Sequence, residues 1–266
     1  MFPLYDLNPH RRFPWFTLLL ILVNVAVMVR EGVQISPETA YEYGFVPKRV
    51  SELGSGQPII VAVEFPDAQG RIVRGEAKLS TEPSDVYRTF ITTMFLHGNW
   101  FHLVMNMWML WVFGNNVEDR LGHFLFVCYY LLGGLVATFS QWTYDPNGTA
   151  PVVGASGAVA AVLGGYAITY PWARVRTLVL LGIPLLFDLP ALVVLGFWFI
   201  LQMVSGLLVI FGGPQEPVAF WAHIGGFVAG IVLMPFMSLG ASPPGTDWRQ
   251  EADDMFRFDD PRAPRE

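Results

Sequence analysis

The sequence is poor in charged residues, in cysteine and in basic clusters, and each shortage excludes a class of protein. Charged residues make up 14% of the 266 residues, whereas soluble domains carry roughly 25%. The single cysteine, Cys128, excludes an intramolecular disulfide framework. The formal net charge is −6, and no basic run indicates binding to nucleic acid. What the chain has instead is 53% hydrophobic residues, which favours a membrane protein with several spans.

Six apolar stretches are predicted to form transmembrane helices. They cover residues 14–29, 100–113, 123–142, 152–170, 189–211 and 220–239. No small-x-small cleavage site follows the first stretch and further spans come after it, so it is interpreted as a helix and not as a signal peptide. Another apolar stretch, 175–187, is interrupted by Gly182 and Pro184. At about 13 residues it is predicted to be an interfacial or re-entrant segment. The predicted fold class is therefore an all-α membrane protein.

The predicted domain organisation is one membrane domain with a tail at each end. Residues 1–12 are predicted to form a cytoplasmic N-terminal tail, residues 13–240 the membrane domain, and residues 241–266 a cytoplasmic C-terminal tail. Mixed charge without apolar periodicity predicts that the C-terminal tail is disordered. The basic residues of the short loops and tails fall on one side of a six-span model, which predicts that both termini are cytoplasmic. With no transit peptide before the first span, a bacterial inner membrane is favoured.

The long first loop, residues 31–99, lies outside the membrane in this scheme. It contains two β-rich runs, 59–65 and 71–77, on either side of a turn-rich stretch. This pattern predicts a β-hairpin. Residues 85–95 are predicted to form an amphipathic approach to the second span. His97, beside a glycine at the interface, is interpreted as a solvated histidine.

A serine flanked by small residues opens the fourth span. Ser156 follows a polar, turn-rich stretch at 144–149, which predicts that it lies in the first turns of a membrane helix. A helix N-terminus presents free N–H groups and the positive end of the helix dipole, which suits a developing oxyanion. The competing interpretation is packing, because Gly, Ala and Ser commonly form helix contacts in membranes.

Polar residues at matching depth in other spans support a catalytic interpretation. Spans two, four and six run in the same direction, and His102, Ser156 and His223 each lie near the start of one of them. Asn106 shares a helix face with His102. A serine nucleophile needs a base within hydrogen-bonding reach, which His223 would supply. His102 and Asn106 would be oxyanion donors together with the Ser156 N–H. Each could instead be an interhelical hydrogen-bonding residue, worth about 1 kcal/mol.

The residues that other classes of protease require are absent from the predicted spans. No Asp or Glu lies at that depth in spans two, four or six, so a serine site here would be a Ser–His dyad, and the two intramembrane aspartates of an aspartyl protease are absent. No HExxH motif occurs, and the histidines have no carboxylate partner in the spans, so no metal site is predicted. Gln202 in the fifth span and Asn24 in the first are interpreted as hydrogen-bonding residues between helices.

Three motifs together resemble the rhomboid family of intramembrane serine proteases. They are GxSG at Gly154-Ala155-Ser156-Gly157, HxxxN at His102–Asn106, and AHxxGxxxG at Ala222-His223 with Gly226 and Gly230. The resemblance covers roughly residues 43–239. It implies a six-helix rhomboid-like bundle in which Ser156 is the nucleophile, His223 the general base, and Asn106 and His102 line the oxyanion hole. It also implies hydrolysis of peptide bonds in transmembrane protein substrates within the lipid bilayer, with no cofactor, and a fifth helix and following cap near 212–219 that control substrate access. Gly154, Gly157, Gly226 and Gly230 would be packing positions.

The chain departs from the family pattern at three places. Tyr87-Arg88 stands where many members have Trp-Arg in the first loop. Ala160 stands where some members have an aromatic residue that stacks on the histidine. Residues 51–81 look like an insertion. Two alternatives stay open: a catalytically silent member of the same fold that binds membrane clients, and a transporter or channel that uses intramembrane histidines, which paired discontinuous spans would favour.

Overall fold

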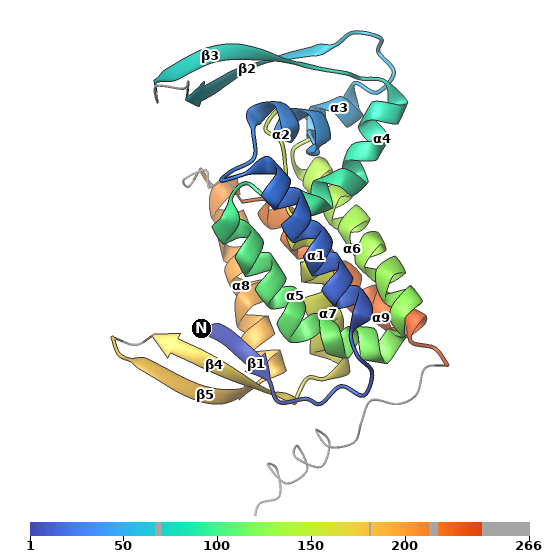
Figure 1. The fold of residues 1–266 in the computed structure, drawn as a ribbon, viewed down its shortest axis with the longest axis vertical. Coiled ribbons are helices and arrows are strands. Elements are labelled where there is room, and N and C mark those ends of the chain that lie inside the picture. The colour runs from blue at the N-terminus through green and yellow to red at the C-terminus, as the bar shows by residue number, and fades with distance from the viewer. Residues whose placement is uncertain (67–70, 181, 213–217, 241–266) are drawn as a thin grey trace, which may run out of the picture.

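The protein is a helical bundle with a small β-sheet at each end, as the computed structural model shows (Figure 1). The structure describes residues 1–66, 71–180, 182–212 and 218–240. Its long helices are α1 (Trp15–Glu31), α5 (Trp100–Leu121), α6 (His123–Tyr144), α7 (Ser156–Thr169), α8 (Ala191–Ile210) and α9 (Phe220–Met237). Each lies at the position of a predicted span.

Three of these helices, α6, α8 and α9, are long and apolar enough to cross a membrane, among the residues that the structure describes. Such helices are typical of an integral membrane protein. Helix α7 is apolar but has only 14 residues, while α1 has 17. The six-span count therefore remains a prediction. The helices and strands support a helical membrane protein with a small amount of β-structure.

Helix α7 is the centre of the bundle, and nearly all its side chains after Ser156 are buried. Glycine and alanine let neighbouring backbones come close to it. The helix starts later than the predicted span, because the preceding residues are extended and bonded to the outer loop. Val152 forms a β-bridge with Phe45, and the N–H of Gly154 donates to the carbonyl of Thr93 at 2.9 Å. These contacts fix the point at which α7 begins.

Helix α5 is longer than predicted, because a polar stretch that resembles a loop finds buried partners. Glu118 is almost completely buried. Its carboxylate accepts from the backbone N–H groups of Phe16 at 3.0 Å and Thr17 at 2.7 Å, in the first turn of α1. The start of α1 has no side-chain cap of its own, so this carboxylate satisfies its free donors and complements its dipole.

A three-stranded antiparallel sheet closes the lower end of the bundle in Figure 1. Its strands, in spatial order, are β1 (Phe2–Asp6), β4 (Arg174–Leu180) and β5 (Pro184–Pro190). Residues 175–187, predicted to be an interfacial or re-entrant segment, fall mostly in the β4–β5 strand pair at this end of the bundle (Figure 1), so the re-entrant alternative is wrong and the interfacial one stays a prediction. Val175 and Thr177 are buried on one face of β4, a period-two pattern typical of a strand. The predicted N-terminal tail contains β1.

Asp6 at the end of β1 joins this sheet to the bundle. Its Oδ2 accepts from the hydroxyl of Tyr166 on α7 and from Nδ2 of Asn116 on α5, both at 2.7 Å. Burial raises the pKa of Asp6 to about 7. The N-terminal strand is therefore bonded to the central helix at the end opposite Ser156.

The first loop forms a separate layer over the upper end of the bundle (Figure 1). It comprises α2 (Pro37–Tyr43), α3 (Pro47–Ser51), β2 (Ile59–Pro66), β3 (Ile72–Leu79), α4 (Pro83–Thr92) and the 3-10 turn η1 (Thr93–Phe95). Strands β2 and β3 pair antiparallel, with Ile59 opposite Leu79, where the sequence predicts a hairpin. The connecting residues 67–70 lie outside the described residues. One face of β2 is buried against Val46 and Tyr41.

Candidate functional site

Ser156 is the first residue of α7, as predicted, and its side chain is half-buried. The turn before it depends on Gly154, whose φ of +136° is disfavoured for other residues. A Cβ added to Gly154 would lie 2.8 Å from Cε1 of His102 and 3.5 Å from Oγ of Ser156. The His102 ring and the Ser156 hydroxyl therefore approach the same point beside Gly154.

Helix α9 packs against α7 next to Ser156, and at this interface the two backbones are in direct contact. A Cβ on Gly226 would lie 2.1 Å from the carbonyl oxygen of Gly157, and one on Gly230 would lie 2.0 Å from that of Ala161. Only glycine permits such approach. Gly157 directly follows Ser156, and His223 lies one turn before Gly226. The contact therefore sets His223 and Ser156 at the same level, which is the matching depth that the sequence predicts.

The imidazole of His223 is held from α8. Its Nδ1 lies 2.9 Å from Oε1 of Gln202, and the ring of Trp198 lies 5.9 Å from the imidazole, centroid to centroid. From the sequence, Gln202 is interpreted only as a hydrogen-bonding residue between helices, without a connection to His223. The available signal is that Gln202 is an amide within a helix that is apolar except for it and Ser205, where an unpaired polar group is costly.

The two residues predicted as oxyanion donors lie one turn apart on α5. The N–H of His102 donates to Oδ1 of Asn99, which caps the helix, at 2.9 Å. Asn106 is buried, and its Nδ2 donates to the carbonyl of His102 at 3.0 Å. A side-chain amide carries two N–H donors, so this bond uses one of them.

His97 is also part of the site, and the expectation that it is solvated is wrong. Its side chain is 2% exposed, and its ring lies 5.1 Å from that of His102. Nε2 of His97 lies 3.4 Å from the backbone nitrogen of Ala155, which donates to it. Burial, with a smaller effect from His102, lowers the pKa of His97 to about 3, so the ring is neutral and can accept. Its burial comes from a segment far along the chain, which local sequence does not reveal.

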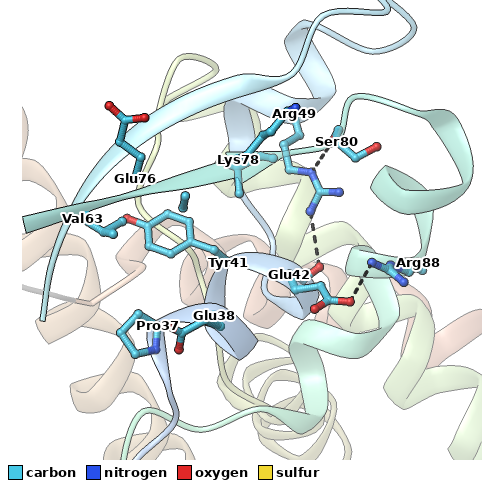
Figure 2. Close-up of a pocket in the computed structure, with 13 residues that line it drawn as sticks. Pro37, Glu38, Tyr41, Glu42, Arg49, Val63, Glu76, Lys78, Ser80 and Arg88 are labelled. Atoms are coloured by element: carbon cyan, nitrogen blue, oxygen red, sulfur yellow. Dashed lines mark hydrogen bonds and ion pairs between the residues drawn. The ribbon is translucent and has the colours of Figure 1, made fainter. Parts of the chain in front are cut away.

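A separate cavity lies in the outer layer, between α2 and the β2–β3 pair (Figure 2). Its volume is about 430 Å³, and acidic and basic side chains both line it. Arg49 donates to the carbonyls of Ser80 at 2.9 Å and Glu42 at 3.4 Å, and the Glu42 carboxylate pairs with Arg88 at 3.5 Å. The Arg88 guanidinium also lies over the Tyr43 ring at 5.0 Å. The arginine of the divergent Tyr87-Arg88 pair therefore stabilises the first loop.

The side chains gathered at this site are of the kinds that nucleophilic catalysis uses. A hydroxyl at a helix N-terminus, an imidazole oriented by a second group, and nearby N–H donors are the components of acyl transfer. Among the described ranges, no three His, Cys, Asp or Glu side chains gather in a way that could hold a metal ion.

Comparison with known proteins gives consistent matches. A model of the Rhomboid domain matches residues 83–239. Rhomboid-like protein 11, chloroplastic, from Arabidopsis thaliana is 32% identical over 157 residues, covering 56% of this chain and 52% of that protein. Presenilin-associated rhomboid-like protein A, mitochondrial, from Danio rerio is 30% identical over 92 residues, covering 34% of this chain and 24% of that protein. Rhomboid protein 1, mitochondrial, from Saccharomyces cerevisiae is 34% identical over 91 residues, covering 33% and 26%.

The matches cover about half of the first relative and about a quarter of the other two. The names of these relatives assign them to chloroplasts and mitochondria. They give no support to the bacterial inner membrane that the sequence favours.

Proposed function

The chain belongs to the rhomboid family, and we propose that it is an intramembrane serine endopeptidase acting on transmembrane proteins. The observation that carries this proposal is the α7–α9 contact. Its two glycine contacts, Gly226 on Gly157 and Gly230 on Ala161, support a placement of His223 level with Ser156, and the ring of His102 and Oγ of Ser156 both lie close to Gly154. Peptide bonds in or near transmembrane segments of its substrates would be cleaved there, within the lipid bilayer.

In the proposed mechanism, Ser156 Oγ attacks the substrate carbonyl carbon. His223 takes the hydroxyl proton during attack and then donates it to the leaving amine. The resulting acyl-enzyme is hydrolysed by water, with His223 again acting as the base. Packing and a neutral amide would orient the imidazole in this dyad, in place of the carboxylate of a Ser-His-Asp triad.

The developing oxyanion needs donors that are already in position. We propose the backbone N–H of Ser156, the His102 ring and the Asn106 amide for this role. The Asn106 amide keeps one N–H after donating to the carbonyl of His102. Removing a single oxyanion donor typically raises the barrier by roughly 3–4 kcal/mol. The mechanism involves no cofactor and no metal.

Cleavage of a single-span model substrate in liposomes tests the proposal. We compare the wild-type protein with Ser156→Ala and His223→Ala, after checking by thermal unfolding that each variant is folded. Both variants are expected to lose cleavage. Asn106→Ala is expected to lower kcat by about 10²-fold with the substrate still bound.

Three other outcomes separate the alternatives. Cleavage that survives Ser156→Ala means that another nucleophile or a contaminant is responsible. A wild-type protein that binds several substrates and cleaves none is a silent member of the family, and the next step is to identify the clients it holds. Solute flux through liposomes without any cleavage would support a transporter.

A further inference from the structure

Helix α8 supplies two groups that flank the His223 imidazole. Trp198 and Gln202 are four residues apart, so they lie on the same helix face. Gln202 Oε1 lies 2.9 Å from His223 Nδ1, and the Trp198 ring lies beside the imidazole. Helix α7 provides no ring here, since position 160 is a buried alanine.

The hydrogen bond to Gln202 determines which ring nitrogen can act as a base. With the Gln202 amide oxygen facing the ring, as the structure assigns it, Nδ1 must carry the proton that it donates, because an amide oxygen is only an acceptor. In a neutral imidazole, Nε2 is then unprotonated. A serine hydroxyl can transfer its proton only to an unprotonated nitrogen. The contact therefore selects the tautomer in which Nε2 is the base.

We propose that Gln202 is the positioning residue for His223, which fixes its tautomer and ring orientation in place of a triad carboxylate. This inference rests on the proposed function, because a positioned base is useful only where Ser156 is a nucleophile. Gln202 acts through His223 and has no contact with substrate in this role.

The position of α8 makes this contact conditional. In its most apolar stretch, 17% of the α8 residues are buried, against 39% in α6 and in α9. Large side chains along α8, including Leu201, Val204 and Leu208, are exposed on the protein surface. The base is therefore set correctly only while α8 rests on α9, and displacement of α8 breaks the bond.

The test compares two substitutions of Gln202. A positioning role and a packing role predict opposite orders of activity for these two variants. Gln202→Leu keeps the approximate size and removes the acceptor. Gln202→Glu keeps the acceptor and adds a negative charge. Ser205→Ala removes a polar group from the same helix and is the matched control. For each variant, kcat and KM for the model substrate are measured from pH 5 to pH 9.

Positioning predicts a distinct pattern in these kinetics. Gln202→Leu lowers kcat by at least about tenfold and leaves KM within about twofold, because binding does not involve the base. Gln202→Glu retains more activity than Gln202→Leu. Its acidic limb moves to higher pH, because a neighbouring carboxylate favours the charged imidazole. Ser205→Ala behaves as the wild type.

A packing role predicts the reverse order. A buried carboxylate is then worse than leucine, so Gln202→Glu is the less stable and less active variant. That result overturns the inference and leaves the proposed function intact, provided that Ser156→Ala is inactive.

The tautomer itself provides a readout that does not require activity. Nitrogen NMR of protein labelled with ¹⁵N-histidine, assigned with His223→Ala, is expected to show protonated Nδ1 in the wild type and in Gln202→Glu. Gln202→Leu is expected to shift the signal towards the other tautomer. An unchanged signal in Gln202→Leu contradicts the inference, even if the wild-type protein proves to cleave nothing.

Discussion

Helix α9 has two faces that pack in opposite ways. Towards α7, backbone meets backbone, with Gly226 against Gly157 and Gly230 against Ala161. Towards α8, large side chains intervene: the ring of Phe199 stacks on that of Phe227 at 4.6 Å. The first interface has no spare space, while the second is a layer of aromatic rings on a largely exposed helix.

The difference assigns separate tasks to the two interfaces. The tight interface determines the distance between the helices that carry Ser156 and His223, and a close-packed contact transmits any change directly. The loose interface carries the group that orients the imidazole. In the proposed mechanism, the site is therefore rigid where Ser156 and His223 must meet, and adjustable where His223 is held.

Gly226→Ala is the change with the largest expected effect, because it breaks the tight interface. The added Cβ would lie 2.1 Å from the carbonyl oxygen of Gly157, a backbone atom that cannot turn aside. Overpacking of this kind costs about 1–3 kcal/mol. We expect a loss of that size in the free energy of unfolding in mild detergent, with cleavage abolished because α7 and α9 separate. A variant as stable and active as the wild type contradicts the close contact.

Tyr129→Phe tests the same interface with a smaller expected effect. The hydroxyl of Tyr129 lies 2.8 Å from the carbonyl oxygen of Ala161 and 2.9 Å from that of Gly230, so it links α6 to both helices. Hydrogen bonds between membrane helices contribute about 0.6–1.7 kcal/mol. We expect unfolding to become easier by about 1 kcal/mol. The control is Tyr130→Phe, since no hydrogen bond joins the Tyr130 hydroxyl to α7 or α9 in the described structure, and an equal loss there would show that the bridge does not matter.

The contacts of the two faces of α9 differ in how far they can be predicted from the sequence. The glycine spacing of Gly226 and Gly230 identifies a close helix contact, because only glycine allows it. The position of Ser156 at a helix start follows from the polar turn before it. The Gln202–His223 bond could not be predicted, because it joins two helices whose relative rotation depends on packing along their whole lengths. The burial of His97 and the pairing of β1 with β4 likewise depend on segments far apart in the chain.

Trp198→Leu tests the loose interface. The Trp198 ring contacts both His223 and Phe227, at 5.9 Å and 6.0 Å between centroids. Because α8 is largely exposed, we expect a loss of stability below about 1 kcal/mol, near the value of one aromatic pair. We expect kcat to fall several-fold, since the imidazole gains freedom. Measuring both in one preparation separates the effects, and a stability loss as large as that of Gly226→Ala would mean that the two interfaces are equally tight.

The smallest expected effect is a gain in stability, from Gly206→Ala on the side of α8. A Cβ at Gly206 would meet Cβ of Phe220 at 3.4 Å, which is ordinary van der Waals contact. Alanine in a helix interior is favoured over glycine by about 0.5–1 kcal/mol, so thermal unfolding should move slightly upward while cleavage stays close to wild type. Gly196→Ala, where a Cβ meets nothing within 4 Å, is the matched control and should give the same gain. If Gly206→Ala instead destabilises the protein as Gly226→Ala does, then α8 packs on α9 as closely as α7 does. In that case the contact that holds His223 is not adjustable, and the difference between the two interfaces does not exist.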